Sequence, residues 1–111
     1  MKVMSTALVA IAAWSGTALA QEEIRVLRVQ PSDPEQAFYE RAEAAYEAQN
    51  PGVDVVFEYI ANEAYKSKLP TLLQSNARPD IFYSWGGQTL VEQAEAGFLK
   101  DISGEITEEV R

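Results

Sequence analysis

Three short runs of the chain have the hydrophobic pattern of β-strands. In residues 24–29 apolar and polar side chains alternate and β-branched residues are frequent, which predicts a strand. Residues 53–60 repeat this pattern, with apolar residues at every second position on one face. Residues 80–83 form a shorter run, apolar enough to predict a third strand that is buried on both faces.

The segments between these runs have apolar residues at helical spacing. The first predicted helix begins at Asp33 and stops before residues 50–52, whose Asn-Pro-Gly sequence ends helices. Asn62 is expected to cap the second helix, and Pro70 inside it is expected to kink it, because proline removes one backbone hydrogen bond. The third begins at about Thr89, and a glycine follows its expected end.

Several signals agree on the start of the first helix. Asp33 can cap it, Pro34 occupies the first helical position, and Gln36 stands where a capping box needs an amide or a carboxylate. The charged residues of this helix are expected to form a solvated face. Its apolar residues recur at Phe38, Ala42, Ala45 and Tyr46.

Strand and helix alternate three times, which predicts an α/β fold with parallel strands and right-handed crossovers. One face of residues 53–60 carries Asp54 and Glu58 and is only half apolar, so this strand is expected at a sheet edge. An outer position for the second strand predicts sheet order 2-1-3. In open parallel sheets, ligands bind beyond the carboxyl ends of the strands where the order reverses. Here that point lies between strands one and three.

Two loops are expected to face each other at this reversal, residues 30–33 after the first strand and residues 84–87 after the third. Trp85 offers a flat apolar face and one N–H donor, which suits the C–H side of a sugar ring. The alternative is that Trp85 only closes the top of the core. The candidate ligand-binding residues are Ser32, Asp33, Ser84, Trp85, Gly86 and Gly87.

The polar groups of these loops suit a polyol. Ser32, Asp33 and Ser84 supply hydroxyl and carboxylate groups, and the Gly86 and Gly87 amides supply donors. Each also has a structural interpretation. Capping a helix is a more ordinary role for Asp33 than contacting a ligand, and the two glycines serve equally well as turn residues.

Composition narrows the classes of function. The 111-residue chain has 17 acidic and 9 basic residues and a net charge of −8, which disfavours binding to nucleic acid or to anionic membranes. It contains no cysteine and no histidine. Thiol sites, histidine-ligated metal sites and Ser-His-Asp or Cys-His catalytic groups are therefore excluded. The sequence indicates no cofactor and no metal.

The first 20 residues have the organisation of a secretory signal peptide. Lys2 gives a positive start, residues 3–13 are almost wholly apolar, and residues 18–20 form a small-apolar-small cleavage site after Ala20. This apolar run is shorter than the roughly 20 residues that span a bilayer; an N-terminal anchor is the alternative. Gln21 stands where bacterial lipoproteins need a cysteine, so a soluble periplasmic product, not embedded in a membrane, is expected.

Three further segments occur in a characteristic order. They are residues 50–55, residues 72–81 with their Pro-Asp-Ile ending, and residues 95–102 with Ala-Gly-Phe-Leu. Together they resemble the N-terminal part of the extracellular solute-binding proteins of ABC importers, family 1, the carbohydrate-uptake group. The similarity covers essentially all of residues 21–111, and residues 84–87 resemble the sugar-binding members in particular.

The resemblance implies a bilobed receptor of the type II periplasmic-binding-protein fold. Such a receptor closes over a sugar, docks on the permease subunits of an ABC transporter and catalyses nothing. Residues 21–111 would be an incomplete N-terminal lobe, and the chain a fragment. Residues 30–33 lack the aromatic side chain that many sugar-binding members place after strand one.

Two other functions stay open. The chain could be a small secreted interaction protein, complete as it stands. A fragment of a glycoside hydrolase would need two carboxylates at the site, and Asp33 has no obvious partner there.

Overall fold

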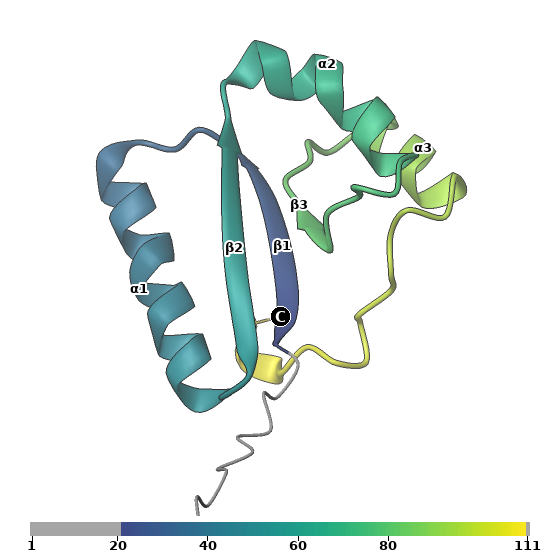
Figure 1. Ribbon diagram of the computed structural model, residues 1–111. Coiled ribbons are helices and arrows are strands. Elements are labelled where there is room, and N and C mark those ends of the chain that lie inside the picture. The colour runs from purple at the N-terminus through teal and green to yellow at the C-terminus, as the bar shows by residue number, and fades with distance from the viewer. Residues whose placement is uncertain (1–20, 111) are drawn as a thin grey trace, which may run out of the picture.

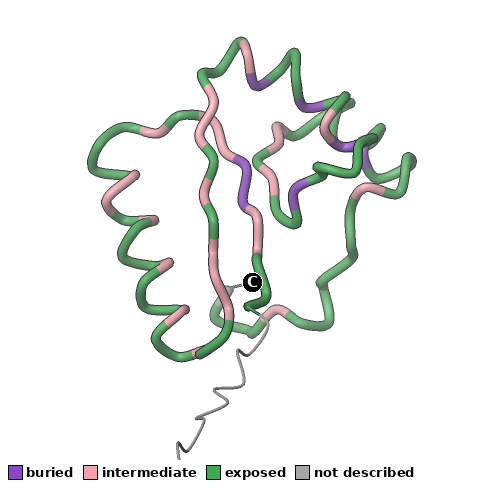
Figure 2. Tube along the Cα trace, viewed as in Figure 1, coloured by how far each residue is buried: buried purple, intermediate pink, exposed green. Residues whose placement is uncertain are grey.

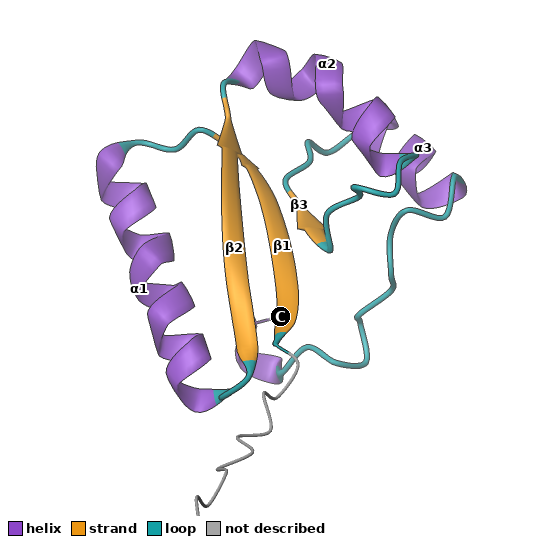
Figure 3. Cartoon of the chain, in the orientation of Figure 1, coloured by secondary structure: helices purple, strands orange, loops and turns teal. Residues whose placement is uncertain are grey.

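The structure, a computed structural model, describes residues 21–110; the expected signal peptide in residues 1–20 lies outside the described residues. The predicted alternation of strands and helices is confirmed (Figures 1 and 3). The elements are β1 (Glu22–Val29), α1 (Asp33–Gln49), β2 (Val53–Ile60), α2 (Asn62–Leu73), β3 (Ile81–Phe82), α3 (Gln88–Glu95) and the short 3₁₀ helix η1 (Glu108–Val110).

The three strands form one parallel sheet in the order β2-β1-β3, so the predicted α/β class and strand order are confirmed. β1 pairs with β2 over its whole length, from Glu22 opposite Val53 to Val29 opposite Ile60. As expected, β2 lies at an edge. Its outward Val55 N–H donates to Oε1 of Glu47 on α1 at 2.8 Å, and this contact occupies a donor that an edge strand leaves free.

The third strand differs from its prediction. It is only two residues long, and Ile81 is 56% exposed, so burial on both faces is wrong. The reason lies in how the helices cover the sheet. α1 packs along β2, on the face that also carries Phe57, and leaves the β3 end of that face open (Figure 1). Phe82 points to the opposite face and packs against the core beneath α2.

The core lies between β1 and α2. Its buried members are Leu27, Tyr65, Leu69 and Leu73, and Figure 2 shows the buried positions on β1, along α2 and near α3. Half-buried Phe82, Trp85 and Phe98 close the cluster from the β3 side. This small apolar group holds together the loops that follow β1 and β3.

Tyr65 of α2 joins three segments of this core. It is fully buried, and its hydroxyl donates to the Tyr83 carbonyl at 2.6 Å, with the Leu27 carbonyl oxygen 3.3 Å away. Burial raises the pKa of this phenol to about 12. Tyr65 therefore fixes the end of β1 relative to the loop that carries Trp85.

The face of α1 that meets the sheet only partly matches the one that apolar spacing indicated, because Ala42 and Tyr46 line a hollow beside the sheet and Phe38 does not. No residue of α1 is buried (Figure 2). Phe38 is 58% exposed. Tyr39 stacks on Phe57 of β2 instead, and Glu47 bonds the β2 backbone.

Glu43 faces the sheet as well, and desolvation, reinforced by nearby carboxylates, raises the pKa of its carboxyl group. The predicted solvated face is therefore confirmed for Glu40 and Arg41, which are exposed, and wrong for Glu43 and Glu47, which are half-buried.

Two helix starts also differ from expectation. Ser32 rather than Asp33 is the N-cap of α1: its N–H and hydroxyl both donate to Oε2 of Glu35, at 3.1 and 2.8 Å. Asn62 is the first residue of α2 and follows the N-cap, Ala61. A short polar side chain caps well from the position just before the first helical residue, and the sequence pattern placed that boundary one residue late.

The end of α3 is as predicted. Gly97 has φ +76°, its N–H bonds the Ala94 carbonyl, and the Phe98 N–H bonds the Gln93 carbonyl. This is the Schellman arrangement, which needs a residue in the left-handed region and is therefore best met by glycine. Phe98 then turns back onto the core, as expected.

Candidate functional site

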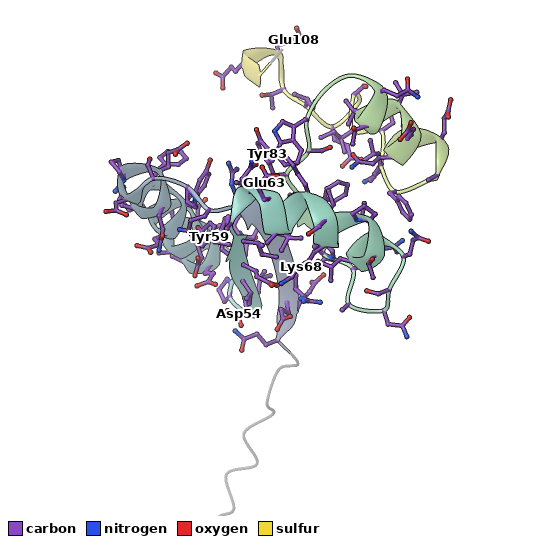
Figure 4. The ribbon with its side chains drawn as sticks, turned by 90° about the horizontal axis from the view of Figure 1, so that it is seen from above. Asp54, Tyr59, Glu63, Lys68, Tyr83 and Glu108 are labelled. Carbon is purple, nitrogen blue, oxygen red and sulfur yellow. The ribbon has the colours of Figure 1, made fainter. Side chains whose placement is uncertain are left out.

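The carboxyl ends of the strands enclose a hollow of about 220 Å³, at the position where the strand order reverses. Its walls come from the end of β1 and the loop after it, from the first turns of α1 and α2, and from the loop after β3. Figure 4 looks down on this edge and shows Tyr83 in the same region as Glu63 in the first turn of α2. The lining residues are Arg28, Val29, Gln30, Pro31, Glu35, Asn62, Tyr83 and Trp85.

Trp85 lies between this hollow and the core. Its indole meets Tyr65 edge-on, with ring centroids 5.8 Å apart, and Tyr83 at 5.1 Å. It is half-buried and packs against the core cluster on one side, while it lines the hollow on the other. The Lys66 ammonium lies 5.6 Å from the ring centroid. Trp85 can therefore pack against the core and contact a ligand at the same time.

Ser84 turns away from the hollow. Its hydroxyl donates to Oε1 of Gln93 at 2.7 Å, and Gln93 is a buried polar residue of α3. This bond ties the loop after β3 to α3. The sequence offered no signal for Gln93, because glutamine on a short helix is ordinarily exposed.

Ser32 and Asp33 stand at the start of α1, outside the lining of the hollow. The hydrogen bonds from Ser32, first from its backbone N–H and then from its hydroxyl, lower the pKa of the Glu35 carboxyl group. Asp33 is exposed and is the first helical residue. The structure thus brings Trp85 to the hollow from the predicted set, and it gives Ser32 and Ser84 structural partners.

The two glycines have different roles. Gly87 adopts φ +85° and ψ −150°, a conformation that is essentially restricted to glycine, and its carbonyl accepts bonds from the Leu90 and Val91 N–H groups at the start of α3. Gly86 has no left-handed φ, and a Cβ at either position would meet open space. The loop therefore requires glycine at position 87 for its backbone angle and not for close packing.

We expect Gly87→Ala to lower the free energy of unfolding by about 1–3 kcal/mol, because alanine is strained in this region. Gly86→Ala is the matched control and should change it by no more than about 0.5 kcal/mol. Urea denaturation of both variants measures the difference. Equal effects at the two positions would show that the backbone angle of Gly87 does not hold the loop.

Sequence reasoning missed Arg28, which lines the hollow near the end of β1. Its guanidinium carbon lies 4.1 Å from the ring centroid of Tyr39 and 5.5 Å from that of Tyr83. A signal was present in the sequence, since Arg28 continues a strand face otherwise formed by Ile24 and Val26. A charged residue at such a position needs a partner or a function.

A second, larger hollow of about 440 Å³ lies between α1 and the sheet. Its lining is mostly apolar and includes Ile24, Val26, Phe57 and exposed Ile81. It shares Arg28 with the first hollow, so this arginine stands between the two.

Other kinds of site find no support in residues 21–110. No group of three or more aspartate, glutamate, histidine or cysteine residues is placed to hold a metal ion in this part of the chain. No helix within the described residues has the length and apolarity to cross a membrane.

Comparison with known proteins is informative about the family of this chain. A search of the curated proteins finds no match. Residues 30–111 match the family model described as bacterial extracellular solute-binding protein, a stretch that runs from the loop after β1 to the end of the chain. The match spans well over half of the sequence. The chain therefore belongs to family 1 of the bacterial extracellular solute-binding proteins, which have a solute-binding role in ABC-type importers.

Proposed function

We propose that this protein binds a sugar or oligosaccharide in the periplasm and delivers it to the permease subunits of an ABC transporter. The observation that carries the proposal is the position of Trp85. It presents its half-buried indole to a hollow at the carboxyl edge of the sheet, where the strand order reverses. The wall around it is rich in polar groups, with Gln30, Glu35 and Asn62 from three different segments.

The expected binding free energy fits a receptor that binds its ligand without catalysing a reaction. A tryptophan side chain buries about 150–250 Å² in full. Covering about half of that area with a sugar ring would contribute roughly 2–3 kcal/mol, at about 25 cal/mol per Å². Hydrogen bonds from the polar wall, at about 1 kcal/mol each, would fix the orientation of the ring. Glu35 is the one carboxylate lining this hollow, whereas glycoside hydrolysis ordinarily uses a pair.

We further propose that residues 21–111 form part of the N-terminal lobe of a bilobed receptor. Large apolar side chains are exposed on the β3 side of the molecule, among them Ile81, Leu90 and Val91. Further chain packed there would cover them and the open edge of β3. A second lobe would then close over the hollow by a hinge motion. Cleavage of a signal peptide after Ala20 would release the mature protein into the periplasm.

The test is a binding screen on the protein expressed at the full length that its gene encodes. Calorimetric titration with neutral and acidic mono- and disaccharides should find at least one ligand. Binding should also change the tryptophan fluorescence, and Trp85→Phe should reduce that change. If no saccharide binds, or if an amino acid or a peptide binds instead, the proposed function is wrong.

A further inference from the structure

Among the described residues, Arg28 forms no ion pair at the proposed binding site. Glu35 is close enough that the pKa of its carboxyl group is lowered by the hydrogen bonds from Ser32 and, to a smaller extent, by the charge of Arg28. Arg28 lies one residue before the end of the central strand β1 and lines the same hollow as Trp85. The ion pairs of residues 21–110 involve Arg25, Lys66 and Lys100, and none involves Arg28. Its Nε is buried and has no hydrogen-bond partner.

The aromatic contacts of Arg28 do not replace an anion. Tyr39 and Tyr83 offer their ring faces to the guanidinium at 4.1 and 5.5 Å, which offsets part of the cost of burying the charge. Contacts with ring faces engage no N–H group in a conventional hydrogen bond. The guanidinium presents five such donors in a planar fork, and that geometry matches a carboxylate.

The acidic side chains near the hollow bind other residues of the protein. Glu35 is the one acidic residue in its lining, and the Oε2 atom of Glu35 already accepts two hydrogen bonds from Ser32. Glu63, in the first turn of α2, pairs with Lys66 at 3.1 Å. The hollow therefore contains a cation that forms no ion pair within the described residues and one carboxylate whose direct hydrogen bonds come from Ser32.

We propose that the preferred ligand is an acidic saccharide, a uronic acid or an oligosaccharide of uronic acids, whose carboxylate binds Arg28 while its ring covers Trp85. The inference rests on the proposed sugar-binding function and names its substrate class. A charge-assisted, bidentate contact between arginine and carboxylate is among the strong hydrogen-bonding arrangements in proteins. It would also give the half-buried Arg28 a directly bonded anion, which it lacks among the described residues.

The test compares sugars that differ only in the carboxylate. The protein at full gene length is titrated with glucuronate against glucose and with galacturonate against galactose, and with the matching disaccharides. At least one acidic sugar should bind about tenfold or more tightly than its neutral counterpart. Arg28→Gln should reduce that ratio to about one, and Arg28→Lys, which keeps the charge without the fork, should retain part of it.

Arg41→Gln is the matched control, because it removes the same charge from an exposed position on α1 outside the hollow. It should leave the ratio unchanged. Circular dichroism and thermal unfolding establish whether each Arg28 variant is folded. If Arg28→Gln does not fold, the affinity ratios of the wild type and of Arg28→Lys test the inference. If sugars bind but no acidic sugar binds more tightly than its neutral counterpart, or if the ratio survives Arg28→Gln, this inference is overturned and the proposed function stands. Binding of no sugar at all would overturn both.

Discussion

Replacement of Leu69 by alanine is expected to lower the free energy of unfolding by about 2–5 kcal/mol. Leu69 lies on α2, is 4% exposed, and belongs to the small buried cluster with Leu27, Tyr65 and Leu73. Removing its branched end leaves a void that so few neighbours cannot fill. Single domains are stable by only about 5–15 kcal/mol, so this loss is a large share of the total.

Chemical denaturation followed by circular dichroism measures the effect. The matched control is Leu90→Ala on α3, which deletes the same atoms from a side chain that is 40% exposed. Its cost should be less than half that of Leu69→Ala, because much of the side chain already contacts water. Similar losses for the two leucines would mean that the core does not lie between α2 and β1.

Replacement of Trp85 by alanine should weaken saccharide binding by about 2 kcal/mol or more, which is roughly a thirtyfold rise in the dissociation constant. The indole is the largest aromatic side chain in the lining of the hollow, and alanine cannot cover a sugar ring. Calorimetric titration of the protein at full gene length, with the ligand found in the binding screen, measures the change.

Because Trp85 also packs against Tyr65 and Tyr83, its loss could act through stability instead of through contact. Trp85→Phe separates the two effects, since phenylalanine keeps much of the packing and a smaller stacking face. The affinity of this variant should lie between those of the wild type and of Trp85→Ala. Phe38→Ala, on the exposed side of α1, should leave affinity unchanged. A dissociation constant that stays the same in a folded Trp85→Ala protein would assign Trp85 to the core alone.

The arrangement of elements could be predicted from the sequence because its signals are local. Alternation along residues 53–60 and the half-polar face with Asp54 and Glu58 were enough to place β2 at an edge. Gly97 could be read as a helix end because only a left-handed residue completes that turn. These features depend on neighbours within a few positions, and the structure confirms them.

The parts that could not be predicted depend on contacts between distant segments. Apolar spacing on α1 pointed to Phe38, yet Tyr39 and Glu47 contact β2, since the rotation of a helix is set by the sheet against which it packs. Ser84 looked like a ligand contact until Gln93, nine residues away, was found to accept its hydrogen bond.

By itself, the sequence determined that the protein is an α/β chain with sheet order 2-1-3, with Trp85 in a loop where that order reverses. It could do so because hydrophobic periodicity and turn residues encode the order of the elements directly. Only the tertiary structure decided which side chains line the hollow beside Trp85. Arg28, Glu35 and Asn62 come from three elements, and whether such groups meet depends on packing angles and strand register, which no local pattern contains.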